Sequence, residues 1–230
     1  MFSWPVFKNL LTAAVFAGLL AGLLLTGVQK IQVSPLILEA EVYEDAAVEA
    51  AHHDEIATDH QEHDHAWQPE NGWERTLYTA AANISLAIGF GLLLGAAICQ
   101  RGKINWRSGL LWGLAGYAVF FVAPSLGLPP EVPGTESAPL ADRQLWWLLT
   151  VVMSAGGLSL MVFVRNWKIK LLGAVMLALP HVIGAPHPEV AHSAAPDDLV
   201  QMFIFATAIA NAVFWLVLGG LMGFFYKKPA

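Results

Sequence analysis

The sequence predicts an all-α integral membrane protein with about six transmembrane helices, arranged as three hairpins with both termini in the cytoplasm. Three observations predict this class. Of the 230 residues, 56% are hydrophobic and 13% are charged, whereas a soluble domain is about one quarter charged. Several uncharged runs reach the ~20 residues that a helix needs to cross a bilayer. The charged residues are segregated between the segments that join these runs, so we treat residues 1–230 as a single membrane domain.

Five runs without Asp, Glu, Lys, Arg or His are long enough to span: Leu10 to Gln29, Thr76 to Gln100, Ser108 to Pro130, Gln144 to Val164 and Leu199 to Tyr226. A cleaved signal peptide is the alternative for the first run. Its apolar length exceeds the usual h-region, and Gly18, Gly22 and Thr26 recur at the four-residue spacing of a packing face. We therefore expect the first run to be retained as a helix.

The sixth span is the least certain in length. The run from Leu171 to Pro180 is short, and only its continuation through His181 to about Pro186 gives enough residues to cross. Pro180 is expected to break or kink this helix near its end. Six spans are therefore predicted, with five as the alternative.

The basic residues predict the orientation, because cytoplasmic loops of membrane proteins are enriched in Lys and Arg. Nine of the twelve fall on one side of a six-span arrangement, and only Lys30, Arg75 and Arg143 fall on the other. Both termini are therefore expected in the cytoplasm. All 18 acidic residues fall in the three outer segments, so the outer side carries a net −15 and the inner side +9. The orientation rule concerns Lys and Arg alone and does not explain this acidic bias.

The second and third outer loops resemble each other. Pro124 to Val132 and Pro180 to Val190 both end an odd-numbered span and both place a Pro-Glu pair at the membrane exit. The return spans share polar pairs four residues apart, on one helix face: Thr79 and Asn83, Thr150 and Ser154, and Thr207 and Asn211. Three related hairpins explain this pattern, and chance similarity is the alternative. The polar pairs are either part of a conduction path or interhelical hydrogen bonds.

The first outer segment, residues 30–75, is an acidic, His-rich loop. It carries five of the eight histidines within fourteen residues: His52, His53, His60, His63 and His65. Imidazole and carboxylate ligands together suit borderline divalent metals such as cobalt, nickel and zinc. The spacing lacks the fixed geometry of a closed site, so we expect weak, exchangeable capture of metal. The alternative is an acidic solvated loop with incidental histidines.

A more selective metal site is predicted where the hairpins converge at the outer membrane boundary, built from His181, His187, Glu131 and Glu189. Proline-broken helix ends free backbone carbonyl groups at this depth, and polar groups there usually face a cavity or a partner. For His181, the alternative is a hydrogen bond that fixes the kink. No acidic residue lies inside a span, and no phosphate-binding loop is present, so the sequence itself indicates no means of energy coupling.

The sequence resembles the CbtA family of predicted cobalt transporter subunits. The resemblance is carried by AGLLAGLLLTGVQ, PLILEAEVYE, the His-rich loop, WQPENGWER, GLPPEVPG with ADRQLWW, and LPHVIGAPHPE, which together cover nearly the whole chain. It implies a multi-pass protein of the bacterial cytoplasmic membrane that imports cobalt for corrinoid synthesis. It also implies a small single-span partner of the CbtB type with a histidine motif.

Cobalt uptake by a permease or permease subunit is therefore the expected function, with Co²⁺ as cargo and Ni²⁺ or Zn²⁺ as alternatives. No resident cofactor is expected, and the partners are lipid, the divalent metal and the single-span subunit rather than nucleic acid. Self-association of the chain is left open. The second hypothesis is a membrane scaffold that presents a metal-binding outer face to a partner without transporting. An enzyme ranks third, because no nucleophile–base arrangement is visible.

Overall fold

The computed structural model describes residues 3–54, 69–100, 105–188 and 192–226, with only the backbone described for 51–54. Within these ranges the regular structure is helical. The helices are α1 (Trp4–Gln32), α2 (Ser34–Asp54), α3 (Trp73–Cys99), α4 (Trp106–Tyr117), the π-helix η1 (Ala118–Val122), α5 (Ala123–Ser125), α6 (Leu140–Phe163), α7 (Trp167–Ile183) and α8 (Asp197–Phe225). This confirms the all-α class.

Five helical segments of the described chain are long and apolar enough to cross a membrane: Trp4–Gln32, Trp73–Cys99, Trp106–Ser125, Leu140–Phe163 and Asp197–Phe225. They match the five uncharged runs, and α4, η1 and α5 together form the third. α7 has 17 residues and begins with Lys168 and Lys170 in its first turns, so its uncharged part is shorter than a usual span. The structure supports five candidate spans, and the sixth stays a prediction.

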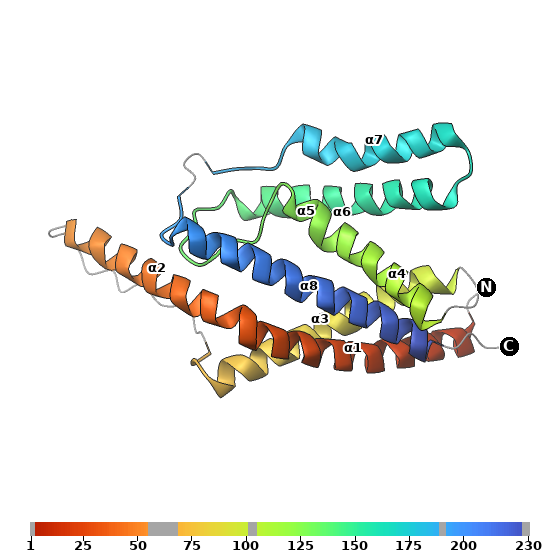
Figure 1. Ribbon diagram of the computed structural model, residues 1–230, viewed down its shortest axis with the longest axis horizontal. Helices are drawn as coiled ribbons and strands as arrows, with labels where there is room; N and C mark the ends of the chain where they lie inside the picture. Colours follow the sequence, from red (N-terminus) through yellow and green to blue (C-terminus); the bar gives the residue numbers. More distant parts are fainter. Residues whose placement is uncertain (1–2, 55–68, 101–104, 189–191, 227–230) are drawn as a thin grey trace.

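The helices run between two ends of the molecule (Figure 1), and the residues at these ends differ in charge. We call one the acidic end: it holds α2, the loop 126–139, the loop 184–196 and the starts of α3, α6 and α8. Every acidic residue of the described chain lies there. The opposite, basic end holds the starts of α1, α4 and α7 and the ends of α3, α6 and α8. α2 continues from α1 and projects beyond the other helices at the acidic end (Figure 1).

Glycines set the closest helix contacts. A methyl group at Gly22 of α1 would lie 2.6 Å from the Cα of Ile84 in α3. Gly109 of α4 lies against the carbonyl oxygen of Gly219 in α8, and a methyl group at Gly157 of α6 would lie 2.7 Å from the carbonyl oxygen of Gly173 in α7. Such small residues allow the backbones to approach closely in a bilayer.

The helix pairs that form these contacts differ from those expected of three separately packed hairpins. In the described chain α1 packs on α3, as the first hairpin predicts, but α4 packs on α8 and α7 packs on α6. α6 contacts the third span through η1 and α5, and the ring of its Phe163 stacks on that of Trp112 in α4, with the centroids 6.0 Å apart. The second and third hairpins are therefore connections along the chain and not packing units, because the Gly-rich face of α4 pairs with that of α8 instead of with α6.

Candidate functional site

The three segments of the acidic end meet at Gly134. The loops 126–139 and 184–196 pair through an antiparallel bridge between Thr135 and Ser193. The amide N–H of Ala194 donates to the carbonyl oxygen of Gly134 at 3.0 Å. A methyl group at Gly134, whose φ is +75°, would lie 3.1 Å from the Cβ of Glu44 in α2 and 3.1 Å from the Cβ of Ala194. The convergence of the outer segments, which the sequence predicts, is therefore present in the fold.

Two ion pairs hold this end together. The guanidinium group of Arg75 in α3 donates to both carboxylate oxygens of Glu41 in α2. In the loop 126–139, the Glu131 carboxylate lies 2.9 Å from the guanidinium group of Arg143 in α6 and accepts a 2.6 Å hydrogen bond from the Ser137 hydroxyl. Both pairs are partly exposed. Two of the three basic residues at the acidic end thus neutralise specific carboxylates.

The three described residues that were predicted for the selective metal site lie on different segments of the chain. Glu131 is held by Arg143, His187 is exposed in the loop 184–196, and His181 lies in the last turn of α7. Glu189 lies outside the described residues, so the complete set of four cannot be compared with the fold. In the described part of the chain, no three His, Cys, Asp or Glu residues are close enough to hold a metal ion.

The histidines predicted to capture metal also lie beyond what the structure describes. His60, His63 and His65 fall outside the described residues, and for His52 and His53, in the last turn of α2, only the backbone is described. α2 is helical as far as Asp54, so the backbone of His52 and His53 is helical. Metal capture by this segment stays a prediction.

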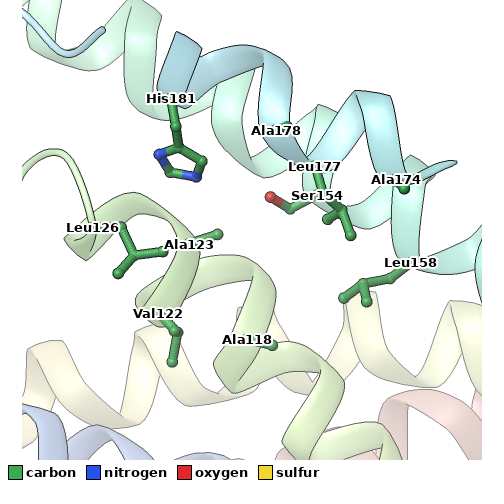
Figure 2. A pocket seen from close by; sticks show the side chains of 10 residues that line it. All are labelled: Ala118, Val122, Ala123, Leu126, Ser154, Leu158, Ala174, Leu177, Ala178 and His181. Carbon is green, nitrogen blue, oxygen red and sulfur yellow. The ribbon is translucent and has the colours of Figure 1, made fainter. Parts of the chain in front are cut away.

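A pocket of about 380 Å³ opens between α6, α7 and the η1–α5 part of the third span (Figure 2). We call it the α6–α7 pocket. It is lined by eight apolar residues and two polar ones: Ala118, Val122, Ala123, Leu126, Leu158, Ala174, Leu177 and Ala178, with Ser154 and His181. The imidazole of His181 and the hydroxyl of Ser154 point into the same space from α7 and α6 (Figure 2).

The position of His181 depends on Pro180 and Trp146. Pro180 is fully buried, and its carbonyl oxygen accepts a 3.2 Å hydrogen bond from the indole N–H of Trp146. The Trp146 ring also meets the His181 ring edge-on, with the centroids 5.9 Å apart. The sequence predicts that Pro180 breaks or kinks this helix near its end. The helix continues through Pro180 and ends three residues later at Ile183, before Gly184, whose φ is +88°. The hydrogen bond from Trp146 in α6 therefore fixes the end of α7 on which His181 lies.

Ser154 differs from the other hydroxyl on its helix face. Thr150 is fully buried, and its hydroxyl donates to the carbonyl oxygen of Trp146 at 2.9 Å. Ser154 is 1% exposed, and its buried Oγ has no hydrogen-bond partner. The sequence predicts Ser154 as one of a polar pair, but it gives no sign that this hydroxyl faces a pocket together with His181. The sequence also does not indicate Trp146 or the π-helix η1 as parts of a site.

The three polar pairs of the return helices make different contacts. The amide of Asn83 donates to the Thr26 hydroxyl at 3.1 Å and to the Gln29 side chain at 2.7 Å, which joins α3 to α1. The amide of Asn211 donates to the carbonyl oxygen of Thr207 in its own helix at 3.0 Å. Interhelical bonding thus accounts for Asn83, whereas Ser154 is the one of these six residues that lines the α6–α7 pocket.

These features define a multi-pass α-helical membrane protein with an acidic end and a mostly apolar pocket that contains a histidine. The chain belongs to the CbtA family, described as the probable cobalt transporter subunit (CbtA), whose family model matches residues 7–227. The resemblance drawn from the sequence motifs is therefore confirmed. Neither the curated proteins nor the solved structures gave a match.

Proposed function

We propose that this chain takes up Co²⁺ across the bacterial cytoplasmic membrane as a permease or permease subunit, with the acidic end facing outward. The family description supports cobalt transport by an assembly of subunits. The observation that carries the proposal is the charge distribution: all 18 acidic residues of the chain belong to the three segments that converge at Gly134. A surface of one charge sign raises the local concentration of the oppositely charged ion.

Capture and selection are separate steps in this proposal. The His-rich segment captures divalent metal weakly, through His52, His53, His60, His63 and His65. The ion then reaches the boundary where the loops 126–139 and 184–196 pair, and where Glu131, His187 and Glu189 supply further ligands. His181 is the innermost of the proposed ligands, because it belongs to α7 and its ring faces the α6–α7 pocket. Weak ligation at each stage allows the ion to leave again.

The proposed assembly includes a small single-span subunit. The word "subunit" in the family description supports a protein partner. The apolar outer face of α7, where Val175 is 53% and Val182 is 78% exposed, is available to lipid or to a further helix. Both termini are proposed to lie in the cytoplasm, because nine of the twelve basic residues belong to that side.

A scaffold that binds metal without transporting it is the second candidate. One observation favours it: Glu131, a proposed ligand on the transport path, is engaged by Arg143. In this case the chain would present its acidic end to a partner that carries the transport site.

Metal flux separates the two candidates. The purified chain is reconstituted into liposomes with a Co²⁺-quenched dye inside, with and without its partner subunit. A permease gives saturable quenching that requires this chain in the membrane. Co²⁺ binding by the reconstituted chain without quenching, in both preparations, would contradict uptake and support the scaffold.

A further inference from the structure

We propose that the α6–α7 pocket is the docking groove for one transmembrane helix of a partner subunit, and that this helix hydrogen-bonds to the imidazole of His181. The presence of a partner subunit and the part of His181 in uptake rest on the proposed function. The place where the partner docks, and the chemistry of its contact, follow from the lining of the groove.

The walls of the groove are three rows of side chains, and each row runs along a helix. Within a row the side chains are four positions apart, which places them close to one helix face. The rows are Ala174 with Ala178 on α7, Ser154 with Leu158 on α6, and Ala118 with Val122 on η1 (Figure 2). Helices pack by fitting a ridge of side chains at this spacing into the groove between such rows. The groove therefore suits a further helix that lies along α7.

The lining has the composition of a helix contact in a membrane. Four of the ten lining residues are alanine: Ala118, Ala123, Ala174 and Ala178. Small side chains allow transmembrane helices to approach each other closely. Ala174 and Ala178 are exposed, and α6 is the one helix of the described chain on which α7 packs extensively. The groove side of α7 is thus suited to a second helix, which the described ranges do not supply.

The size of the groove limits how the partner sits in it. The volume is about 380 Å³, about a dozen times the ~30 Å³ of one water in the liquid. A complete helix with its side chains is about 10–12 Å across and needs more room than this. The groove therefore takes several side chains from one face of the partner helix, while the partner's backbone lies over the alanines.

Two hydrogen-bonding groups in the groove indicate a helix and not a lipid chain. The His181 imidazole meets the Trp146 ring edge-on, and its nitrogen atoms have no hydrogen-bond partner within the described chain. The Ser154 Oγ is buried and also lacks a partner there. Polar groups at membrane depth usually face a cavity or a partner. A transmembrane helix can supply hydrogen-bonding side chains on an apolar body, whereas an acyl chain has none.

The partner's contribution at His181 is one hydrogen-bond acceptor. A neutral imidazole has one N–H donor and one acceptor nitrogen. A side-chain oxygen of Ser, Thr, Asn or Gln on the partner helix would hold the N–H and leave the other nitrogen free for the ion of the proposed function. Such outer partners orient the rings of metal-binding histidines. Trp146 fixes the backbone before His181 through the Pro180 carbonyl oxygen, and the partner helix fixes the ring itself.

Photo-crosslinking locates the partner in cells that express this chain with an epitope-tagged single-span subunit. The photoreactive amino acid p-benzoylphenylalanine replaces Ala174 on one wall or Val122 on the opposite wall. The control position is Val175, which is exposed on the outer face of α7. We expect adducts with the subunit from both walls and none from Val175. Adducts from Val175 alone, adducts between two copies of this chain, or no protein adduct from either wall would overturn docking in the groove.

Groove-filling substitutions test the same contact by exclusion. Ala174→Trp and Ala178→Trp place a large ring in the groove at positions that are exposed, so the helix contacts within the chain stay intact. About tenfold less subunit should co-purify with them, because overpacking a close contact is destabilising. Val175→Trp is the matched control and should co-purify as much subunit as wild type. Equal co-purification by Ala174→Trp and Val175→Trp, at equal amounts of monodisperse protein, would contradict docking in the groove.

The hydrogen bond is tested by two substitutions of one residue. His181→Phe keeps a ring and should weaken binding of the subunit in nanodiscs about threefold, the average effect of one hydrogen bond between membrane helices. His181→Gln keeps a donor and should bind nearly as wild type does, although it no longer offers an imidazole to the ion. Equal binding by both variants would show that His181 makes no hydrogen bond to the partner.

These results are distinguishable from failure of the proposed function. Adducts from both walls without Co²⁺ flux in liposomes would support the docking groove and contradict uptake. Wild-type flux without an adduct from either wall would support uptake and contradict the docking groove.

Discussion

The indole N–H of Trp146 donates a 3.2 Å hydrogen bond to the carbonyl oxygen of Pro180, which joins α6 to α7 one residue before His181. The same indole ring lies against Gly127, where a methyl group would be 2.5 Å from its Cη2 atom. Trp146 therefore connects the loop 126–139 with both helices that line the pocket. Its role in this account is to position His181.

Trp146→Phe removes the hydrogen bond and keeps an aromatic ring. We expect this substitution to lower the free energy of unfolding by about 1 kcal/mol and to reduce Co²⁺ uptake, because the hydrogen bond that fixes the end of α7 is lost. Thermal unfolding in nanodiscs and cellular uptake are the measurements. Trp147→Phe is the matched control, since Trp147 is 37% exposed on the same helix. Equal unfolding and uptake of the two variants would refute a positioning role for Trp146.

Glu131 and Arg143 allow a paired test of the proposed entry site. Glu131→Gln should lower uptake at all Co²⁺ concentrations, because a carboxylate ligand is lost. Arg143→Gln releases the carboxylate from its ion pair and should strengthen Co²⁺ binding, by at most about fivefold, since partly exposed ion pairs are worth up to about 1 kcal/mol. Isothermal titration with Co²⁺ and uptake assays measure both effects. If Arg143→Gln weakens binding as much as Glu131→Gln does, the pair is structural and Glu131 is not a ligand.

The His-rich segment is expected to set the rate of capture and not the selectivity. Replacing His52, His53, His60, His63 and His65 together should slow uptake at low Co²⁺ and leave the rate at saturating Co²⁺ unchanged. Added salt should reduce the difference by screening the acidic residues around them. Initial uptake rates over a range of Co²⁺ concentrations provide the measurement. Loss of uptake at saturating Co²⁺ would mean that these histidines coordinate the transported ion.

The proposed orientation predicts which segments are reachable from outside the cell. A protease site inserted in the segment 30–75 should be cleaved in intact spheroplasts, whereas a tag after Tyr226 should be protected until the membrane is opened. The reason is the excess of basic residues on the side of both termini. Protection of the segment 30–75 in intact spheroplasts would reverse the orientation.

Much of the fold can be predicted from the sequence because lipid imposes a simple pattern. An uncharged run of sufficient length must be helical, since its backbone groups have no other partners in a bilayer, and all five such runs are helices. α7 is less predictable, because Lys168 and Lys170 shorten its apolar part. Helix pairing was not predictable: Gly109 and Gly113 mark a packing face on α4, but nothing in the sequence identifies Gly219 of α8 as its partner.

The candidate site was predictable only in part. The sequence singles out His181 as a histidine after a proline at membrane depth, and the similar Pro-Glu loops indicate three related hairpins. The other polar residue of the α6–α7 pocket is Ser154, 27 positions before His181 in the chain. A serine inside an apolar run is usually explained by a hydrogen bond to its own helix. The expectations drawn from the sequence do not include the π-helix at Ala118–Val122, which lies directly before Ala123 and Pro124.

Co²⁺ entry into proteoliposomes at saturating metal tests the central claim most directly, with wild type, His181→Ala and the control His192→Ala compared at equal protein content. Saturation removes the contribution of the His-rich segment, so the rate reports passage through the membrane part. We expect saturable entry for wild type and His192→Ala, and a rate for His181→Ala lower by about tenfold or more, since losing even an outer-shell partner of a metal ligand has an effect of this size. No entry with wild type, or equal entry with His181→Ala, would contradict passage of Co²⁺ by way of His181.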